Sequence, residues 1–169
     1  GAMVVASARL GLWKNELEQA FLRINEIPFD SDRKRMTTVH HIESDHVTLK
    51  ALNGINRVDP PHAYVAFTKG SVDGLLEIST HVWVDGKSLP LNEAWRKKIE
   101  TANISLAGKG MRVLGVAMRY FSENPVPALL ESGLTFIGMY GMIDPPRQEV
   151  KSAVGLTKSA GIRTVMITG

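Results

Sequence analysis

The chain has 169 residues, a length that suits one ordinary domain and leaves little room for two complete ones. Hydrophobic residues make up 44% and charged residues 22%, which predicts a packed core and excludes wholesale disorder. Cysteine is absent, which excludes a disulfide framework, a thiolate zinc site and a cysteine nucleophile, and favours a cytosolic compartment. The formal charge of +3 is a mild basic excess, too small for a nucleic-acid patch and equally suited to an anionic small ligand.

The first half of the chain is predicted to be helical and then rich in strands. Residues 1–3 resemble the remnant of a cleaved tag, although they could also be native, and they are left out of the fold prediction. Helical spacing of apolar residues predicts helix over 4–21 with a break at Gly11, and Pro28 then interrupts. Strands are predicted over 36–42 and 46–51, joined around 44–45, followed by a loop over 53–61 and a strand over 64–68.

The next segments predict two helices and a short strand. Ser71 is a candidate N-cap for a helix to about residue 79, and a brief strand over 82–85 precedes a loop at Gly86. Asn92 is predicted to cap a longer helix that ends at Gly108 and Gly110. Its apolar stripe is expected to face the core, with the i,i+4 pairs 93/97 and 96/100 on the surface.

The last third of the chain changes character. Segments 112–121 and 134–143 are long and apolar, which predicts two central strands. The double proline at 145–146 precedes a predicted helix with Val150, Ala153, Val154 and Thr157 on one side and then a strand over 162–168, a pattern typical of a parallel α/β unit. We therefore expect the start of a second domain there.

Common catalytic and metal motifs are absent. None of the five histidines has HExxH spacing, and adjacent His40 and His41 point to opposite faces of their strand, so no metal site is expected. Gly108-Lys109-Gly110 lacks the serine or threonine and the upstream glycine of a Walker loop, and its neighbourhood also misses the dinucleotide pattern, so it is interpreted as a helix end. No Gly-x-Ser-x-Gly string is present.

Four short strings are unusual together. Phe29 stands five residues before the middle of a basic cluster, which suits base stacking and phosphate neutralisation, although a core phenylalanine at a strand start is the more common reading. Lys69 lies where a strand meets a helix start; Gly70 would allow a ligand close, and free N–H groups favour an anion, although a surface lysine at a turn is more common. Arg112 opens a strand, and 141–147 ends one with a rigid double-proline corner.

In this order the chain resembles the cytosolic nucleotide-binding domain of P-type cation-transporting ATPases, most closely the type II calcium pumps. The resemblance runs from about Val4 to Gly169 and rests on F-D-S-D-R-K-R-M-T, F-T-K-G-S, G-M-R-V-L-G-V-A, G-M-I-D-P-P-R and A-G-I-R-T-V-M-I-T-G. It implies that Phe29 stacks on adenine, that Lys69 lies deep in the pocket, and that Arg112 reaches the phosphates with Leu114 lining the base. The implied ATP-binding set is Phe29, Lys34, Met36, Lys69, Gly70, Arg112 and Leu114.

The resemblance also implies a domain organisation. Residues 4–143 would be the nucleotide-binding domain, truncated at its N-terminus, and 144–169 the hinge and start of the phosphorylation domain. Asp144, Pro145, Pro146 and Arg147 would form the hinge, and Thr168 and Gly169 would begin the T-G-D motif. The expected fold is α+β, an antiparallel twisted sheet flanked by helices, followed by a partial α/β unit.

The chain departs from the family pattern at several points. The K-G-A motif reads K-G-S here, and Ser31 stands where sarcoplasmic reticulum pumps carry an arginine, which puts that phosphate contact in doubt. The phosphorylated D-K-T-G-T loop is absent from the sequence, so no catalytic residue is expected in this piece, which would be inactive alone.

The resemblance implies one function and leaves one rival. The domain would hold ATP with Mg²⁺ and present the γ-phosphate to an aspartate of the phosphorylation domain, driving transport of a cation, with Ca²⁺ favoured. Expected partners are ATP and the phosphorylation and actuator domains of a membrane pump, with no nucleic acid and a monomeric piece. The same domain from a pump for another cation is a second form of this function. The rival is a regulatory nucleotide-binding module without a catalytic partner, against which the D-P-P-R and T-G strings argue.

Overall fold

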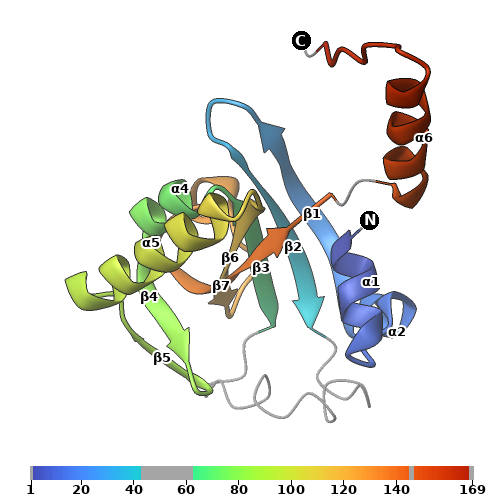
Figure 1. Cartoon of the computed structure of the whole chain (residues 1–169). Helices are drawn as coiled ribbons and strands as arrows, with labels where there is room; N and C mark the ends of the chain where they lie inside the picture. Colours follow the sequence, from blue (N-terminus) through green and yellow to red (C-terminus); the bar gives the residue numbers. More distant parts are fainter. Residues whose placement is uncertain (1, 43–62, 145–146, 168–169) are drawn as a thin grey trace.

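The computed structural model describes residues 2–42, 63–144 and 147–167. One sheet and its flanking helices make up the body of the molecule (Figure 1). Within the described part, no helix is both long enough and apolar enough to cross a membrane. In chain order the elements are α1 (Ala2–Arg9), α2 (Lys14–Ala20), β1 (Phe21–Asp30), β2 (Arg35–Ile42), β3 (Tyr64–Gly70), α4 (Val72–Ile78), β4 (Ser79–Val84), β5 (Lys87–Pro90), α5 (Glu93–Gly108), β6 (Arg112–Phe121), η2 (Pro127–Leu129), β7 (Leu134–Met142) and α6 (Gln148–Ser159).

The sheet has seven strands in the order β1-β2-β3-β6-β7-β4-β5. Neighbouring strands pair antiparallel except β4 and β7, which run parallel. The predicted α+β fold with an antiparallel sheet and flanking helices is confirmed, with this one parallel pair added. Strands β6 and β7 lie in the interior of the sheet, as their length and apolar character predicted.

Apolar clusters cover both faces of the sheet. Leu75, Ile99, Ala117 and Phe136 belong to a cluster that buries α4 and α5 against β6 and β7. Met118 belongs to a second cluster, built with Ala20, Phe21 and Val65 at the junction of α2 and β1. Because Ala117 and Met118 are neighbours on β6, they point to opposite faces, so α4 and α5 cover one face and α2 the other (Figure 1).

Helix α5 begins where the sequence predicted. The Oδ1 of Asn92 accepts a hydrogen bond from the backbone N–H of Trp95 at 3.0 Å, which satisfies one of the free donors of the first turn. Ser71 occupies the N-cap position of α4, but its side chain makes no capping hydrogen bond. The expected surface pairing of Arg96 with Glu100 is wrong, since the Arg96 guanidinium donates to the carbonyls of Leu76, at 2.9 Å, and Ser79, at 3.4 Å.

Strand β1 was not predicted, because Pro28 indicates an interruption. The predicted first helix divides around Gly11 into α1 and α2, and the chain then runs as β1 through Pro28 to Asp30. A proline has no N–H to donate, but β1 is an edge strand with one neighbour, and its register with β2 shifts between Ile27 and Asp30. Pro28 falls in that shift, where it removes no ladder hydrogen bond.

The predicted C-terminal α/β unit is not confirmed. Its helix forms as α6, but no side chain of α6 is buried, and Figure 1 shows α6 standing apart from the sheet. The predicted strand over 162–168 is wrong for the described residues 162–167, which have no regular structure; Val165, Met166 and Ile167 are at least 70% exposed. A strand requires a neighbour for its backbone hydrogen bonds, and the described part of the chain provides none beside this segment. The predicted strand over 46–51 and the loop over 53–61 lie outside the described residues.

Candidate functional site

Met36 and Lys69 form the centre of the candidate site, on one face of the sheet. They are direct cross-strand partners on β2 and β3, and Lys69 is in turn the partner of Val116 on β6. Leu114 and Arg112 stand two and four residues before Val116, so strand alternation places them on the same face. The structure therefore brings together four of the residues that the sequence predicted as binding residues.

A cavity of about 210 Å³ opens at this cross-strand pair. Lys69 is only partly exposed there, and the cavity is smaller than the ~300 to 1,000 Å³ of most small-molecule sites. It would therefore enclose one part of a nucleotide and leave the rest on the open surface. The lining residues are Met3, Met36, Thr38, Phe67, Thr68, Lys69, Val116 and Tyr140.

A larger cavity, of about 440 Å³, lies further along the same face between the sheet and the helices α1 and α2. Its lining is mainly apolar and includes Phe21, Phe67 and His40. Burial lowers the pKa of His40, which lies 3.1 Å from the Phe21 carbonyl oxygen through Nδ1. None of the predicted binding residues lines this cavity, so it belongs to the packing of α1 and α2.

Phe29 is not a core residue. Its side chain is 64% exposed near the end of β1, so the alternative reading of a buried ring is wrong. The next residue, Asp30, pairs with Arg35 on β2. The register of β1 against β2 shifts between Ile27, which pairs with Thr37, and Asp30, so strand alternation does not assign the ring to one face of the sheet. The exposed ring at this end of β1 is available for stacking.

Lys34 lies in the turn between β1 and β2 with an exposed side chain. Its φ of 50° is in the left-handed region, which a residue with a side chain occupies at some cost. Two backbone hydrogen bonds hold it there: its N–H donates to Asp30 at 2.8 Å, and its carbonyl accepts from the N–H of Ser71 at 3.1 Å. The N–H of Ser71 is therefore already used and is not available to the anion that the sequence predicts at the start of α4.

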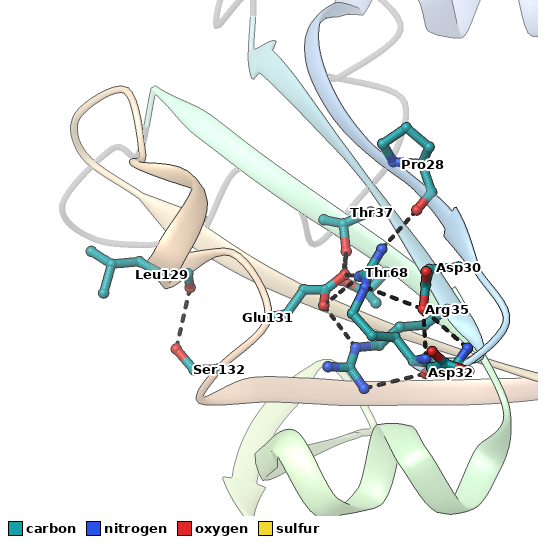
Figure 2. A network of polar contacts seen from close by, with 10 residues as sticks. Pro28, Asp30, Asp32, Arg35, Thr37, Thr68, Leu129, Glu131 and Ser132 are labelled. Carbon is teal, nitrogen blue, oxygen red and sulfur yellow. Dashed lines mark hydrogen bonds and ion pairs between the residues drawn. The ribbon is translucent and has the colours of Figure 1, made fainter.

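The basic cluster around Lys34 is smaller than the sequence indicated. Arg33 donates to both carboxylate oxygens of Glu131, at 2.7 and 2.8 Å, and Arg35 donates through Nε at 2.8 Å (Figure 2). Both arginines are thereby committed to an internal carboxylate. Of the three expected cations, Lys34 alone keeps an exposed side chain.

Glu131 is the residue that sequence reasoning missed. It lies between η2 and β7, 98 residues after Arg33, and its side chain is only 12% exposed. Burial raises the pKa of its carboxyl, but hydrogen bonds from Arg33, Arg35 and Thr37 and the charge of Arg35 outweigh burial, so the pKa lies below its usual value. The only sequence signal was the i,i+2 spacing of Arg33 and Arg35 around Lys34.

Gly70 allows a close backbone approach, although not on the face of Lys69. A Cβ at this position would lie 2.6 Å from both the Lys34 carbonyl oxygen and the Arg35 Cβ. Gly70 pairs with Arg35 and Gly115, so it faces away from the cavity. Its structural role here is to let β3 pass the turn that carries Lys34.

The remaining predicted residues are outside this face. Asp144 and Arg147 are exposed beyond the end of β7, whereas Pro145, Pro146, Thr168 and Gly169 lie outside the described residues. No group of three or more His, Asp or Glu side chains within 2–42, 63–144 and 147–167 is arranged to hold a metal ion.

Comparison with known proteins decides the family. The description "P-type ATPase, cytoplasmic domain N" matches residues 1–149, most of the chain. The chain belongs to this family. The resemblance seen in the sequence is thereby confirmed.

Curated relatives of this N domain are named as transporting ATPases or as the alpha chain of one. Calcium-transporting ATPase 1 of Bacillus cereus is 41% identical over 99% of this chain, and a calcium-transporting ATPase of Bacillus subtilis is 32% identical over 100%. The potassium-transporting ATPase alpha chain 1 of Xenopus laevis is 32% identical over 91%. The chain spans 17%, 17% and 14% of these proteins.

Proposed function

We propose that this N domain binds adenine nucleotide on the sheet face that carries Met36 and Lys69. The observation that carries the proposal is the cross-strand pairing of these two residues at one cavity, in a chain of the P-type ATPase family. The cavity accepts the base, whose π-face stacks on Phe29. Lys69, which is partly buried and lines the cavity, supplies a charged hydrogen-bond donor.

The phosphates are assigned to the end of the sheet where Lys34 and Arg112 lie. Gly70 pairs with both Arg35 and Gly115, so the turn with Lys34 and the first residues of β6 are at the same end. Both side chains are exposed, and each provides a cation for phosphate oxygens. Leu114 lies between Arg112 and the cavity and contributes an apolar contact.

Mg²⁺ enters this proposal with the nucleotide. When bound, it neutralises charge on the phosphate oxygens. Because no carboxylate cluster is found in the described part of the chain, we assign this domain no protein ligand for the ion. The domain's own contribution is to position the nucleotide and offset part of its negative charge.

At the level of the whole protein we propose an ATP-driven cation pump. Residues 4–143 would carry the nucleotide, and 144–169, with Asp144 and Arg147, would lead into a phosphorylation domain whose aspartate accepts the γ-phosphate; an actuator domain completes the cycle. Ca²⁺ is favoured as cargo because the relative at 41% identity is named a calcium-transporting ATPase, whereas the potassium-transporting one is 32% identical.

An ATP titration followed by amide chemical shifts tests the proposal. We expect a dissociation constant in the high micromolar to millimolar range, ~4 to 5.5 kcal/mol, because an open site offers one ring and a few cations. Shifts should concentrate at Phe29, Lys34 and Lys69. Lys69→Met should weaken binding, whereas Lys87→Met, on β5 at the far edge of the sheet, should not. No perturbation near Phe29 or Lys69 at millimolar ATP would contradict the proposal.

A further inference from the structure

One polar network lies on the face of the sheet opposite the candidate site. Glu131 accepts hydrogen bonds from Arg33 and Arg35 and from the hydroxyl of Thr37, the last at 3.0 Å. Thr37 is in turn 2.9 Å from the hydroxyl of Thr68, and both threonines are fully buried. Figure 2 shows Arg35 and Thr37, both from β2, directed toward Glu131, with Thr68 of β3 beside Thr37.

Apart from Glu131, each member of the network is a sequence neighbour of a proposed binding residue. Arg33 and Arg35 flank Lys34, and Arg35 and Thr37 flank Met36. Thr68 directly precedes Lys69. Successive residues of a strand point to opposite faces, so the network fixes the backbone from behind while the binding side chains project from the front.

Phe29 is attached to the same network through its own peptide group. The second terminal nitrogen of Arg33 donates to the carbonyl of Pro28 at 2.8 Å, and that carbonyl belongs to the peptide joining Pro28 to Phe29. Arg33 therefore bridges Glu131 and the backbone at Phe29. The register of β1 against β2 shifts in this region, so few hydrogen bonds between the strands hold the backbone at Phe29.

Lys34 is the binding residue whose backbone conformation depends most on such contacts. Its left-handed backbone conformation stores strain that the surrounding structure must hold. Both neighbouring residues are tied to the carboxylate of Glu131, whose side chain is 12% exposed and whose charge is paired on two sides. Release of that carboxylate would let the turn relax.

We propose that Glu131 is a positioning residue for the nucleotide: through Arg33, Arg35 and Thr37 it holds Phe29, Lys34 and Met36 in the arrangement that binds. This inference rests on the proposed function. Glu131 does not touch the nucleotide and lies on the other face of the sheet.

The test compares the 169-residue chain with Glu131→Gln, which keeps the size of the side chain and removes its charge. ATP affinity should fall about three- to tenfold, a coupling usual for residues of one network. Glu131→Asp, which restores the charge, should recover part of that loss. The amide signals of Lys34 and Ser71 should shift in Glu131→Gln before ATP is added, because their mutual hydrogen bond depends on the turn.

The matched control is Arg96→Met. Arg96 also donates to backbone carbonyls, but at α4 and β4, away from the turn. It should lower the midpoint of thermal unfolding and leave ATP affinity unchanged. If Glu131→Gln does not fold, Arg35→Gln replaces it, because Arg33 still pairs with the carboxylate there; the same loss of affinity is expected.

Two results would overturn the inference in different ways. A lower unfolding midpoint with wild-type ATP affinity in Glu131→Gln or Arg35→Gln would make the network purely structural, with the proposed function intact. Absence of ATP-induced shifts in the unmodified chain would instead remove the proposed function, and the positioning role would fall with it.

Discussion

Replacing Phe29 should change ATP affinity without changing the stability of the fold. It is 64% exposed, so its removal leaves no cavity in the core. Phe29→Ala should therefore lower ATP affinity by the ~1 to 3 kcal/mol that stacking contributes per base, while the free energy of unfolding changes little. Calorimetric titration and denaturant unfolding measure the two quantities.

The control for Phe29 is Leu22→Ala, a second exposed apolar residue on β1, at 55% exposure. It should leave ATP affinity unchanged. A collapse of stability in Phe29→Ala with unchanged affinity of the folded protein would restore the core reading of this ring.

Glu131 makes folding sensitive to acid. Its pKa is lower in the folded chain than in the unfolded one, so the ionised carboxylate stabilises the fold above its ordinary pKa of 4.5. That stability is lost as the pH falls from this value through the lower, folded pKa. Glu131→Gln should therefore lose less stability than the wild type over this window, as measured by urea unfolding at several pH values.

Asp30 also contributes to the acid sensitivity of the fold. Hydrogen bonding from the backbone N–H of Arg33 lowers the pKa of Asp30 as well, so some acid sensitivity should remain in Glu131→Gln. An identical pH dependence in both proteins would show that the Glu131 carboxylate gains no stabilisation from its arginines.

Sequence patterns predicted the binding residues on one face of the sheet better than the polar network on the opposite face. Strand alternation alone places Met36 and Lys69 on one face once the two strands are paired. Glu131 has no such signal, because a contact across 98 residues leaves no periodic mark in the sequence. The sequence showed Arg33 and Arg35 only as part of a basic cluster suited to neutralising phosphate, whereas in the folded chain both pair with Glu131.

At the level of the elements, α5 offers the sharpest prediction. Asn92→Ala removes the acceptor for the Trp95 N–H and should destabilise the protein by about 0.5 to 2 kcal/mol in denaturant unfolding. Ser105→Ala, at an exposed position inside the same helix, should be neutral or slightly stabilising. ATP affinity should stay unchanged in both, and a loss of affinity in Asn92→Ala would link α5 to the site.

Elements were predictable where local signals agreed with their surroundings. At the Asn92 cap and in the apolar strands β6 and β7, the local sequence signal and the tertiary surroundings favour the same structure, and all three predictions are confirmed. Strand β1 was missed because Pro28 normally ends a strand, and only its place at the edge of the sheet removes that penalty. Residues 162–167 have strand-like composition, but within the described part of the chain no strand lies beside them, and composition alone does not predict whether a neighbour is present.

The whole chain should hold ATP without reacting with it. Phosphoryl transfer requires an acceptor in line with the γ-phosphate, and the sequence contains no Asp-Lys-Thr-Gly-Thr string. After incubation with radiolabelled ATP and Mg²⁺ and an acid quench, we expect no hydroxylamine-sensitive label on the protein. Heat-denatured chain provides the background.

Stoichiometric labelling would contradict this passive role. Mapping the labelled peptide would then identify the nucleophile, with Asp144 as the first carboxylate to replace. The view of this chain as a nucleotide carrier would have to be abandoned.

The parallel pairing of β4 with β7 has a consequence for how the protein is made on the ribosome. Strand β4 ends at Val84, but its inner neighbour begins only at Leu134, and Leu134 and Phe136 complete the cluster that buries Val82. At ~5 to 20 residues per second, the intervening stretch of about 50 residues takes roughly 3 to 10 s to translate. During that interval β4 and β5 lack the strand that joins them to the rest of the sheet, and Val82 lacks the contacts of Leu134 and Phe136 until β7 emerges.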